Sequence, residues 1–412
     1  MSNNTTTYKN SPLGKIPIDW DVKRISDFGK VLTGNTPPTN DVNNYGEEYM
    51  FVSPGDLSER KYILQTEKRL SKKGFDISRK FPEGSILFTC IGSTIGKSGI
   101  ATKDLTSNQQ INAIIVHSKD SNEFLYYQLE RSAYKIKLIA GEQAVPIINK
   151  SQFEAIKLIC PPLPEQRAIA SCLSTIDAAI TKTNQLIAQK ELRKKWLMQQ
   201  LLTGKKRLKG FGGEWKEVRM ENIFNRITRK NVEVNTNVVT ISAKRGFVRQ
   251  TDFFNKSIAS EILDNYFLVK KGEFCYNKSY SNGYPWGATK RLNDFEKAVV
   301  TTLYICFGIR NEKKTSGDFF EQYFEANSLD KGLTKIAHEG GRAHGLLNVT
   351  PNDFFGLKIM IPAFEEQTAI AKVLQAADQE IQLLKAKAEK LKEEKKGMMQ
   401  VLLTGKIRLK IQ

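Results

Sequence analysis

Apolar side chains recur at alternating steps of four and three residues in two long segments of the chain. This spacing is a heptad pattern, which is typical of α-helices that wind around a partner helix. A helix from Glu165 to Leu202 would be roughly 57 Å long at 1.5 Å per residue. The seam positions are Ile169, Leu173, Ile176 and Ile180 in the first segment, and Ile370, Leu374, Ile381 and Leu384 in the second.

The two segments are copies of one another. PPLPEQRAIASCLSTID at 161–177 matches PAFEEQTAIAKVLQAAD at 362–378, and LLTGKKRLK at 201–209 matches LLTGKIRLK at 402–410. One constant offset relates both matches, because Glu165 becomes Glu366 and Gly204 becomes Gly405. Pro164 suits a first helical turn, and Thr203-Gly204 provides a left-handed stop. The chain is therefore predicted to be a tandem duplication in which each long helix is the partner of the other, rather than to carry two unrelated surface helices.

The regions before each helix are expected to be globular and to mix helices with strands. Runs at 84–91 and 298–307 are typical of buried strands, and short helices are expected around 123–138 and 317–333. The two regions resemble each other only at their edges, where Trp20 has a counterpart in Trp215 and residues 149–153 have one in residues 350–354. The helices are nearly the same in both copies of the repeat, whereas the globular regions differ. This indicates a fixed frame that presents two different surfaces. The expected fold is α+β, with globular domains at 1–160 and 210–361 and helices at 161–209 and 362–412.

The composition also predicts a polyanionic partner and a reducing environment. The net charge is +19 and the pI is near 9.5, which favours binding to nucleic acid. Residues 161–209 carry +7 of this charge, whereas 1–160 and 210–360 carry only +4 and +5, so the globules are expected to bind through local patches. Five scattered cysteines without a CxxC argue against a disulfide framework or a zinc site. No stretch reaches the roughly 18 apolar residues of a membrane span, and a cytoplasmic location is expected.

Basic and polar clusters in the globules are the candidate DNA contacts. A solvated surface role is the alternative for each single residue, so the prediction concerns the patches. In the first globule the candidates are Arg60, Lys61, Lys68, Arg69, Lys72, Lys73, Arg79, Lys80 and Lys97. In the second they are Lys244, Arg245, Arg249, Lys278, Tyr280, Asn282, Lys290, Arg291 and Arg342. Tyr284 and Trp286 are further aromatic residues between Lys278 and Lys290.

The doubled order of a Gly-Glu-Trp-type start, a variable region, PPLPEQ, a long helix and LLTGK resembles the specificity subunits of type I restriction-modification systems. The resemblance covers nearly the whole chain. It implies two target recognition domains that each read one half of a split site in double-stranded DNA. It also implies that the helices pack antiparallel as a spacer, with pseudo-twofold symmetry, and dock two methyltransferase subunits. Those partners would carry the S-adenosylmethionine-dependent methylation of adenine, and separate motor-nuclease subunits would cut unmodified DNA, so this chain is expected to bind no cofactor and to catalyse nothing.

Other chemistry finds little support in the sequence. Gly92-Ser93-Thr94-Ile95-Gly96-Lys97-Ser98 has three residues between its glycines, whereas a P-loop needs four to surround a phosphate. The resemblance implies instead a glycine turn near the recognition surface, with Gly283, Gly287 and Thr289 in a related place. Asn35-Thr36-Pro37-Pro38 is not the motif that holds a target adenine, and His117, His338 and His344 have no partner at metal-ligand spacing. A nuclease site built from acidic residues that lie far apart in the sequence remains an alternative on the sequence alone.

The competing hypothesis is a coiled-coil scaffold that joins proteins and ignores DNA. It would leave the two divergent basic globules without a purpose. Trp196, Met198 and Met399 are candidates for an exposed docking face on the helices, with core packing as the alternative.

Overall fold

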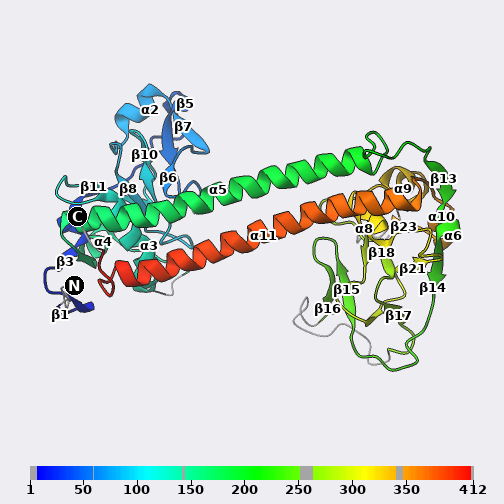
Figure 1. The fold of residues 1–412 in the computed structure, drawn as a ribbon. Coiled ribbons are helices and arrows are strands. Elements are labelled where there is room, and N and C mark those ends of the chain that lie inside the picture. Colours follow the sequence, from blue (N-terminus) through cyan, green and yellow to red (C-terminus); the bar gives the residue numbers. More distant parts are fainter. Residues whose placement is uncertain (1–6, 59, 142–143, 251–262, 340–346, 410–412) are drawn as a thin grey trace. The chain divides into compact units, whose positions relative to one another are not determined.

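The computed structural model describes residues 7–58, 60–141, 144–250, 263–339 and 347–409. The chain divides into two compact units (Figure 1). Unit 1 consists of Met1–Thr183 and Lys387–Gln412, and unit 2 of Asn184–Ala386. Each unit contains one globular region and part of both long helices.

The two long helices are α5 (Leu163–Leu201) and α11 (Phe364–Leu402), each of 39 residues. Each is followed by a glycine in the left-handed conformation, since Gly204 and Gly405 both have φ of 71°. The observed α5 begins two residues before and ends one residue before the predicted Glu165–Leu202.

Ion pairs inside each unit show that the paired helix segments run antiparallel. In unit 2, Lys190 contacts Glu380 and Lys194 contacts Asp378, so rising numbers on α5 meet falling numbers on α11. In unit 1, Lys395 contacts Asp177 at 2.9 Å. The Lys194–Asp378 and Lys395–Asp177 pairs are the same pair in the two copies of the repeat.

The globular part of unit 1 is built on a five-stranded sheet with the order β4-β11-β8-β9-β6. A smaller sheet has the order β10-β5-β7, and β3 pairs with β12. The strands are β1 (Tyr8–Ser11), β2 (Gly14–Pro17), β3 (Asp21–Arg24), β4 (Gly29–Thr33), β5 (Tyr45–Val52), β6 (Tyr62–Ile63), β7 (Lys68–Leu70), β8 (Ile86–Thr89), β9 (Ser98–Ala101), β10 (Thr106–Ser107), β11 (Ile111–Val116) and β12 (Lys157–Cys160). The helices are α1 (Ile25–Phe28), η1 (Val42–Asn44), α2 (Lys72–Ile77), α3 (Asn122–Ile139) and α4 (Lys150–Ala155).

Unit 2 is built on a four-stranded sheet with the order β14-β21-β18-β19. Its core is rich in phenylalanine, and the Phe224 and Phe307 ring centroids lie 5.0 Å apart. The strands are β13 (Lys216–Arg219), β14 (Phe224–Ile227), β15 (Val239–Ser242), β16 (Gly246–Arg249), β17 (Phe267–Lys270), β18 (Phe274–Asn277), β19 (Ala288–Arg291), β20 (Lys297–Val300), β21 (Ile305–Ile309), β22 (His338–Glu339), β23 (Leu347–Asn348) and β24 (Lys358–Ile361). The helices are α6 (Met220–Ile223), α8 (Gly317–Glu325), α9 (Asp330–Ile336) and α10 (Pro351–Gly356).

The two globular parts share one frame although their middle sequences do not align. The order β4-β11-β8-β9 in unit 1 is repeated as β14-β21-β18-β19 in unit 2, and both sets are antiparallel throughout. The β3–β12 pair is repeated as β13–β24. The elements α2, β5 and β7 of unit 1 lie away from the long helices (Figure 1), and unit 2 has the hairpin of β15 and β16 and the β17–β20 pair in addition to the shared sheet.

Two sequence expectations were wrong in detail. The expected single strand at 298–307 is two strands, β20 and β21, joined by a turn in which the Tyr304 amide donates to the Thr301 carbonyl. The expected helix at 317–333 is interrupted between α8 and α9, where Asn327 adopts a φ of 55°. A helix cannot continue through a left-handed residue, so Asn327 ends it.

The C-terminal end of each long helix packs into the globular core beside the start of the other helix. Leu402 and Leu403 share the core of unit 1 with Ile169 and Leu173, and Leu201 and Leu202 share that of unit 2 with Ile370 and Leu374. The first seam positions therefore lie in globular cores and not only between helices. Farther along, Ile381 is buried, whereas Ile176, Ile180 and Leu384 are half-buried.

Buried carboxylates fix these helix ends. Arg408 binds Glu165 through two hydrogen bonds of 2.7 and 2.6 Å, and Arg207 binds Glu366 through two of 2.6 Å. The Trp20 indole also donates to Glu165 at 2.9 Å. These hydrogen bonds raise the pKa of both arginines.

Replacing Gly405 with alanine tests the closure of unit 1. A Cβ at Gly405 would lie 2.5 Å from the Pro17 ring in a left-handed conformation, whereas a Cβ at Gly212 would meet nothing within 4 Å. We expect Gly405→Ala to lower the free energy of unfolding by about 1–3 kcal/mol, and Gly212→Ala to leave it nearly unchanged. Urea titration measures both, and equal midpoints for the two variants would contradict the packing described.

Candidate nucleic-acid interface

Matching loops leave the same edge of the shared sheet in both units. In unit 1 residues 90–97 connect β8 to β9, and in unit 2 residues 278–287 connect β18 to β19. Gly96 and Gly287 close these loops with φ of 102° and 81°. A Cβ at Gly287 would lie 2.4 Å from the Asn277 carbonyl oxygen, so glycine is required there. Each of these glycines thus lies at the end of its loop, shortly before the second strand.

Amide side chains gather beside the unit 1 loop. The Cys90 amide donates to the Gln110 carbonyl at 2.8 Å, and the Asn108 side chain donates to the Gln110 side chain at 3.0 Å. The Thr36 hydroxyl donates to the Gln109 side chain at 2.8 Å, and Gln109 is exposed. We call Thr36, Lys97, Asn108, Gln109 and Gln110 the unit 1 loop edge. Asparagine and glutamine amides match the hydrogen-bonding edge of adenine in the major groove.

This amide cluster was not predicted from the sequence. The available signal was the polar run Ser107-Asn108-Gln109-Gln110 directly before the apolar strand β11. Such a run marks a loop, but only the fold brings it beside residues 34–36 and 90–97.

Aromatic side chains dominate the matching loop of unit 2. Tyr284 is buried and donates to Glu325 at 2.7 Å, and the amide of Asn327 donates to the Gly283 carbonyl at 2.9 Å. These contacts anchor the loop, while Tyr280 is 63% exposed and Asn282 is exposed. Burial lowers the pKa of Lys278, which lies at the start of the loop. We call Lys278, Tyr280 and Asn282 the unit 2 loop edge.

Most of the first basic patch is exposed, and three of its exposed lysines pair with acids. Lys73 pairs with Asp41 at 2.7 Å, and Asp76 pairs with both Lys72 and Lys80. The Arg69 guanidinium donates to the Glu47 carbonyl, and that of Arg79 donates to the Thr33 carbonyl. Exposed ion pairs contribute little to stability and exchange readily for phosphate. The remaining members, Arg60, Lys68 and Lys97, are exposed.

Three side chains that were predicted to contact DNA form ion pairs within the protein instead. Lys61 is buried, donates to Ser174 at 2.6 Å and pairs with Glu123 at 3.2 Å. Lys290 pairs with Glu325, and Arg291 pairs with Asp318 at 2.5 Å. A cation already neutralised and largely desolvated has little to offer a phosphate, so the structure does not support these three residues as DNA contacts.

The remaining candidates of unit 2 lie in the hairpin of β15 and β16. Lys244 and Arg245 are exposed at its turn, and the exposed Arg249 lies 5.7 Å from the Phe295 ring centroid. Arg342 and His344 lie outside the described residues.

Each globular part is also tied to the helix pair by a matching triad. In unit 1 the Tyr127 hydroxyl donates to Asp177 at 2.6 Å, and Asp177 pairs with Lys395. In unit 2 the Gln322 side chain donates to Asp378 at 2.9 Å, and Lys194 donates to the other oxygen at 2.5 Å. Tyr127 lies on α3 and Gln322 on α8, so the triads tie these two helices, which pack against β9 and β19 of the shared sheet, to the adjacent segments of the long helices.

Comparison with known proteins decides the family. The model of the type I restriction modification DNA specificity domain matches residues 17–191 and again residues 212–393. The chain belongs to this family. The two matches follow the internal duplication, and they place one specificity domain in each copy of the repeat.

Curated relatives and solved structures agree with this assignment. The chain is similar to two specificity subunits of type I restriction enzymes from Methanocaldococcus jannaschii. It is 24% identical to the MjaVIII subunit over 439 residues, which cover 96% of this chain and 95% of that one. It is 33% identical to the MjaIX subunit over 204 residues, which cover 47% of each chain. The crystal structure of a type I restriction-modification S subunit from M. genitalium shares the fold with a TM-score of 0.56 at 15% identity, over 98% of this chain and 97% of that one.

Members of this family recognise DNA sequence, and this chain is a sequence-specific DNA-binding specificity subunit. The scaffold hypothesis without DNA recognition is not favoured. Among the residues that the structure describes, no group of three or more His, Cys, Asp or Glu side chains is placed to hold a metal ion. None of the described helices is long and apolar enough to cross a membrane.

Replacing Lys97 tests the unit 1 loop edge. Lys97 is exposed directly before β9, and the exposed Lys103 follows the opposite end of the same strand. We expect Lys97→Ala to weaken DNA binding several-fold and to lower the salt dependence by about 0.9, the loss of one phosphate contact. Lys103→Ala is the matched control and should change neither. Fluorescence anisotropy over a salt series measures both, and an equal effect of the two variants would argue against this edge.

Proposed function

We propose that unit 1 and unit 2 each read one half of a bipartite site in double-stranded DNA. The observation that carries this proposal is one sheet frame, present twice, with different side chains on the matching loop edge. Amides on one edge and exposed tyrosine and asparagine on the other would recognise different base sequences. Exposed lysines and arginines around these edges would position the protein on phosphates.

The long helices would set the separation of the two half-sites. Two readers attached to a common helical frame engage only half-sites at one spacing and one phase around the duplex. The matching triads at Asp177 and Asp378 support this role, because they tie α3 and α8, which pack against the shared sheet, to the long-helix segments of their own unit.

The internal repeat also supports docking of two identical methyltransferase subunits. A repeated structure presents the same surface twice, so that one partner type can bind two places on a single chain. In this proposal the partners bind S-adenosylmethionine and methylate adenine in each half-site, and restriction subunits join the complex to cut unmodified DNA in the cytoplasm. The chain itself would supply recognition and assembly.

Selection from a pool of random duplexes tests this function. With methyltransferase subunits present, the chain should enrich duplexes that carry two short fixed elements separated by a gap of constant length. Enrichment of a single continuous element, or of no sequence over random DNA, would contradict bipartite recognition.

Lengthening the helices tests the spacing. One heptad inserted in both helices, after Thr183 and after Ala386, adds roughly 10 Å, which is about three base pairs. The selected gap should change while both half-sites stay the same. The control is a seven-residue insertion between Gly212 and Gly213, where there is open space and no helix, and it should keep the original gap. An unchanged gap after the heptad insertion would refute the spacing role.

A further inference from the structure

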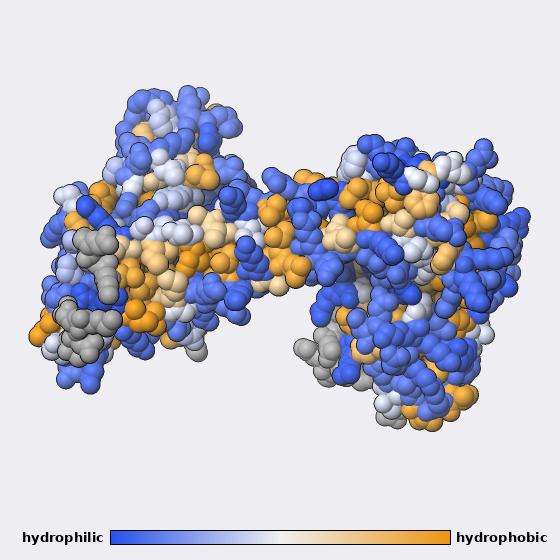
Figure 2. Space-filling model, viewed as in Figure 1, coloured by the Kyte–Doolittle hydropathy of each residue, from blue (hydrophilic) through white to orange (hydrophobic). Residues whose placement is uncertain are grey.

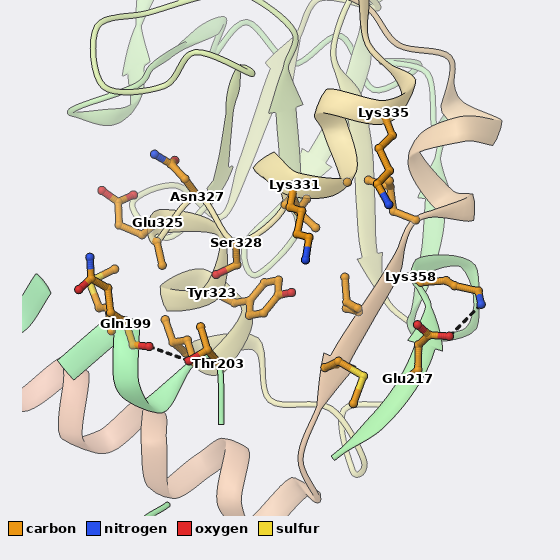
Figure 3. Close-up of a pocket in the computed structure, with 18 of the residues that line it drawn as sticks. Gln199, Thr203, Glu217, Tyr323, Glu325, Asn327, Ser328, Lys331, Lys335 and Lys358 are labelled. Atoms are coloured by element: carbon orange, nitrogen blue, oxygen red, sulfur yellow. Dashed lines mark hydrogen bonds and ion pairs between the residues drawn. The ribbon is translucent and has the colours of Figure 1, made fainter. Parts of the chain in front are cut away.

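A cavity of about 870 Å³ opens in unit 2 beside the end of α5. The end of α5 forms one wall through Gln199 and Thr203, and the turn between α8 and α9 forms another. Strand β24 contributes Met360, which is 45% exposed. Figure 3 shows Lys331 and Lys335 extending from α9 toward this space, opposite the strand that carries Lys358.

Unit 1 has the matching cavity, of about 790 Å³, beside the end of α11. Gln400 and Thr404 stand where unit 2 has Gln199 and Thr203, and Ile159 of β12 stands where unit 2 has Met360. One wall differs, because the hairpin of β1 and β2 contributes Tyr8, Leu13 and Lys15. We call the two cavities the unit 1 groove and the unit 2 groove.

Both grooves carry positive charge. Lys195, Lys331 and Lys335 line the unit 2 groove and form no ion pair with the described residues, whereas Glu217 and Glu325 are engaged by Lys358 and Lys290. Lys15, Arg131, Lys135 and Lys406 line the unit 1 groove, with no carboxylate among the described lining residues. Burial lowers the pKa of Arg131, because desolvation disfavours the charged guanidinium.

The lining favours a protein segment over a nucleic-acid backbone. Met198, Leu202 and Leu329 line the unit 2 groove beside the exposed Met360, whereas contacts to nucleic-acid phosphates are made by charged and polar groups. In unit 1 a segment of protein, the β1–β2 hairpin with its half-exposed Leu13, already borders the groove. Figure 2 shows that apolar surface is also exposed along the long helices.

We propose that each groove binds an acidic, partly apolar segment of one methyltransferase subunit, so that the two grooves dock two copies of the same partner. This inference rests on the proposed function, and it locates the docking surface. Identical glutamine and threonine side chains at matching places offer one partner type the same contacts twice. The lysines supply charge complementarity at both places.

Charge reversal in each groove provides the main test. The unit 2 variant is Lys331→Glu with Lys335→Glu, and the unit 1 variant is Lys135→Glu with Lys406→Glu, all at exposed positions. The matched control is Lys313→Glu with Lys314→Glu, at exposed lysines before α8. The chain is co-purified with its methyltransferase subunit, and native mass spectrometry measures the number of subunits bound.

The wild-type chain and the control should bind two methyltransferase subunits. Each groove variant should bind one and the combined variant none, with affinity at the altered groove lowered about tenfold or more. Two subunits on the combined variant would overturn the groove inference alone. A wild-type chain that binds no methyltransferase would overturn the docking part of the proposed function and this inference with it.

A photo-crosslinking residue at Met360 tests occupancy without altering charge. In the assembled complex with DNA, irradiation should crosslink the photo-reactive residue at position 360 to an acidic segment of the methyltransferase. Peptide mass spectrometry identifies the crosslinked segment. The same residue at Leu303, which is 57% exposed on the β20–β21 turn, serves as the control and should give no such product. A crosslink from position 360 to DNA would overturn the proposal in favour of a nucleic-acid occupant.

Discussion

The buried carboxylates Glu165 and Glu366 hold the molecule together, because each binds an arginine that follows the other long helix. Arg408 reaches Glu165 and Arg207 reaches Glu366, both through two short hydrogen bonds. Glu165 and Glu366 are only 1% and 2% exposed, so a missing arginine would leave a buried charge without a partner. The C-terminal end of each helix is thereby fixed in the globular core that contains the start of the other helix. Unit 1 is closed in this way by residues from both ends of the chain.

This closure separates the parts of the chain that must stay alike from those that are free to differ. The helix ends, the β3–β12 and β13–β24 pairs and the Asp177 and Asp378 triads recur at matching places. The four-stranded order recurs as well, but its connecting loops carry amides in unit 1 and aromatic side chains in unit 2. Specificity can change within such loops without disturbing the helices. The helix-end wall of the two grooves belongs to the constant part, which suits a partner that is the same for both units.

The sequence predicted the helices and the duplication because heptad spacing and matched motifs are local signals. Ile169 and Ile370 were found by periodicity, and Gly204 and Gly405 by their place after a helix. The common sheet of the globules was missed, because strand order depends on pairing between distant residues, such as Phe88 with Asn112 and Tyr276 with Ile305. Lys61 shows that the contacts of a single side chain cannot be predicted from its place in the sequence. It stands in the densest run of basic residues, yet the fold turns it toward Ser174 and Glu123. The amides at 108–110 gain significance only because residues 34–36 and 90–97 lie beside them.

If two different readers on one frame recognise one split DNA site, the methylation pattern in cells must show it. Single-molecule sequencing of methylated adenines, in cells that carry this chain and its methyltransferase, reads that pattern. We expect one motif with two unlike half-sites, a gap of constant length and a methylated adenine in each half. Exchange of residues 107–110 should then alter only one half-site. A single continuous motif, or an exchange that changes both halves together, would contradict recognition by two separate readers.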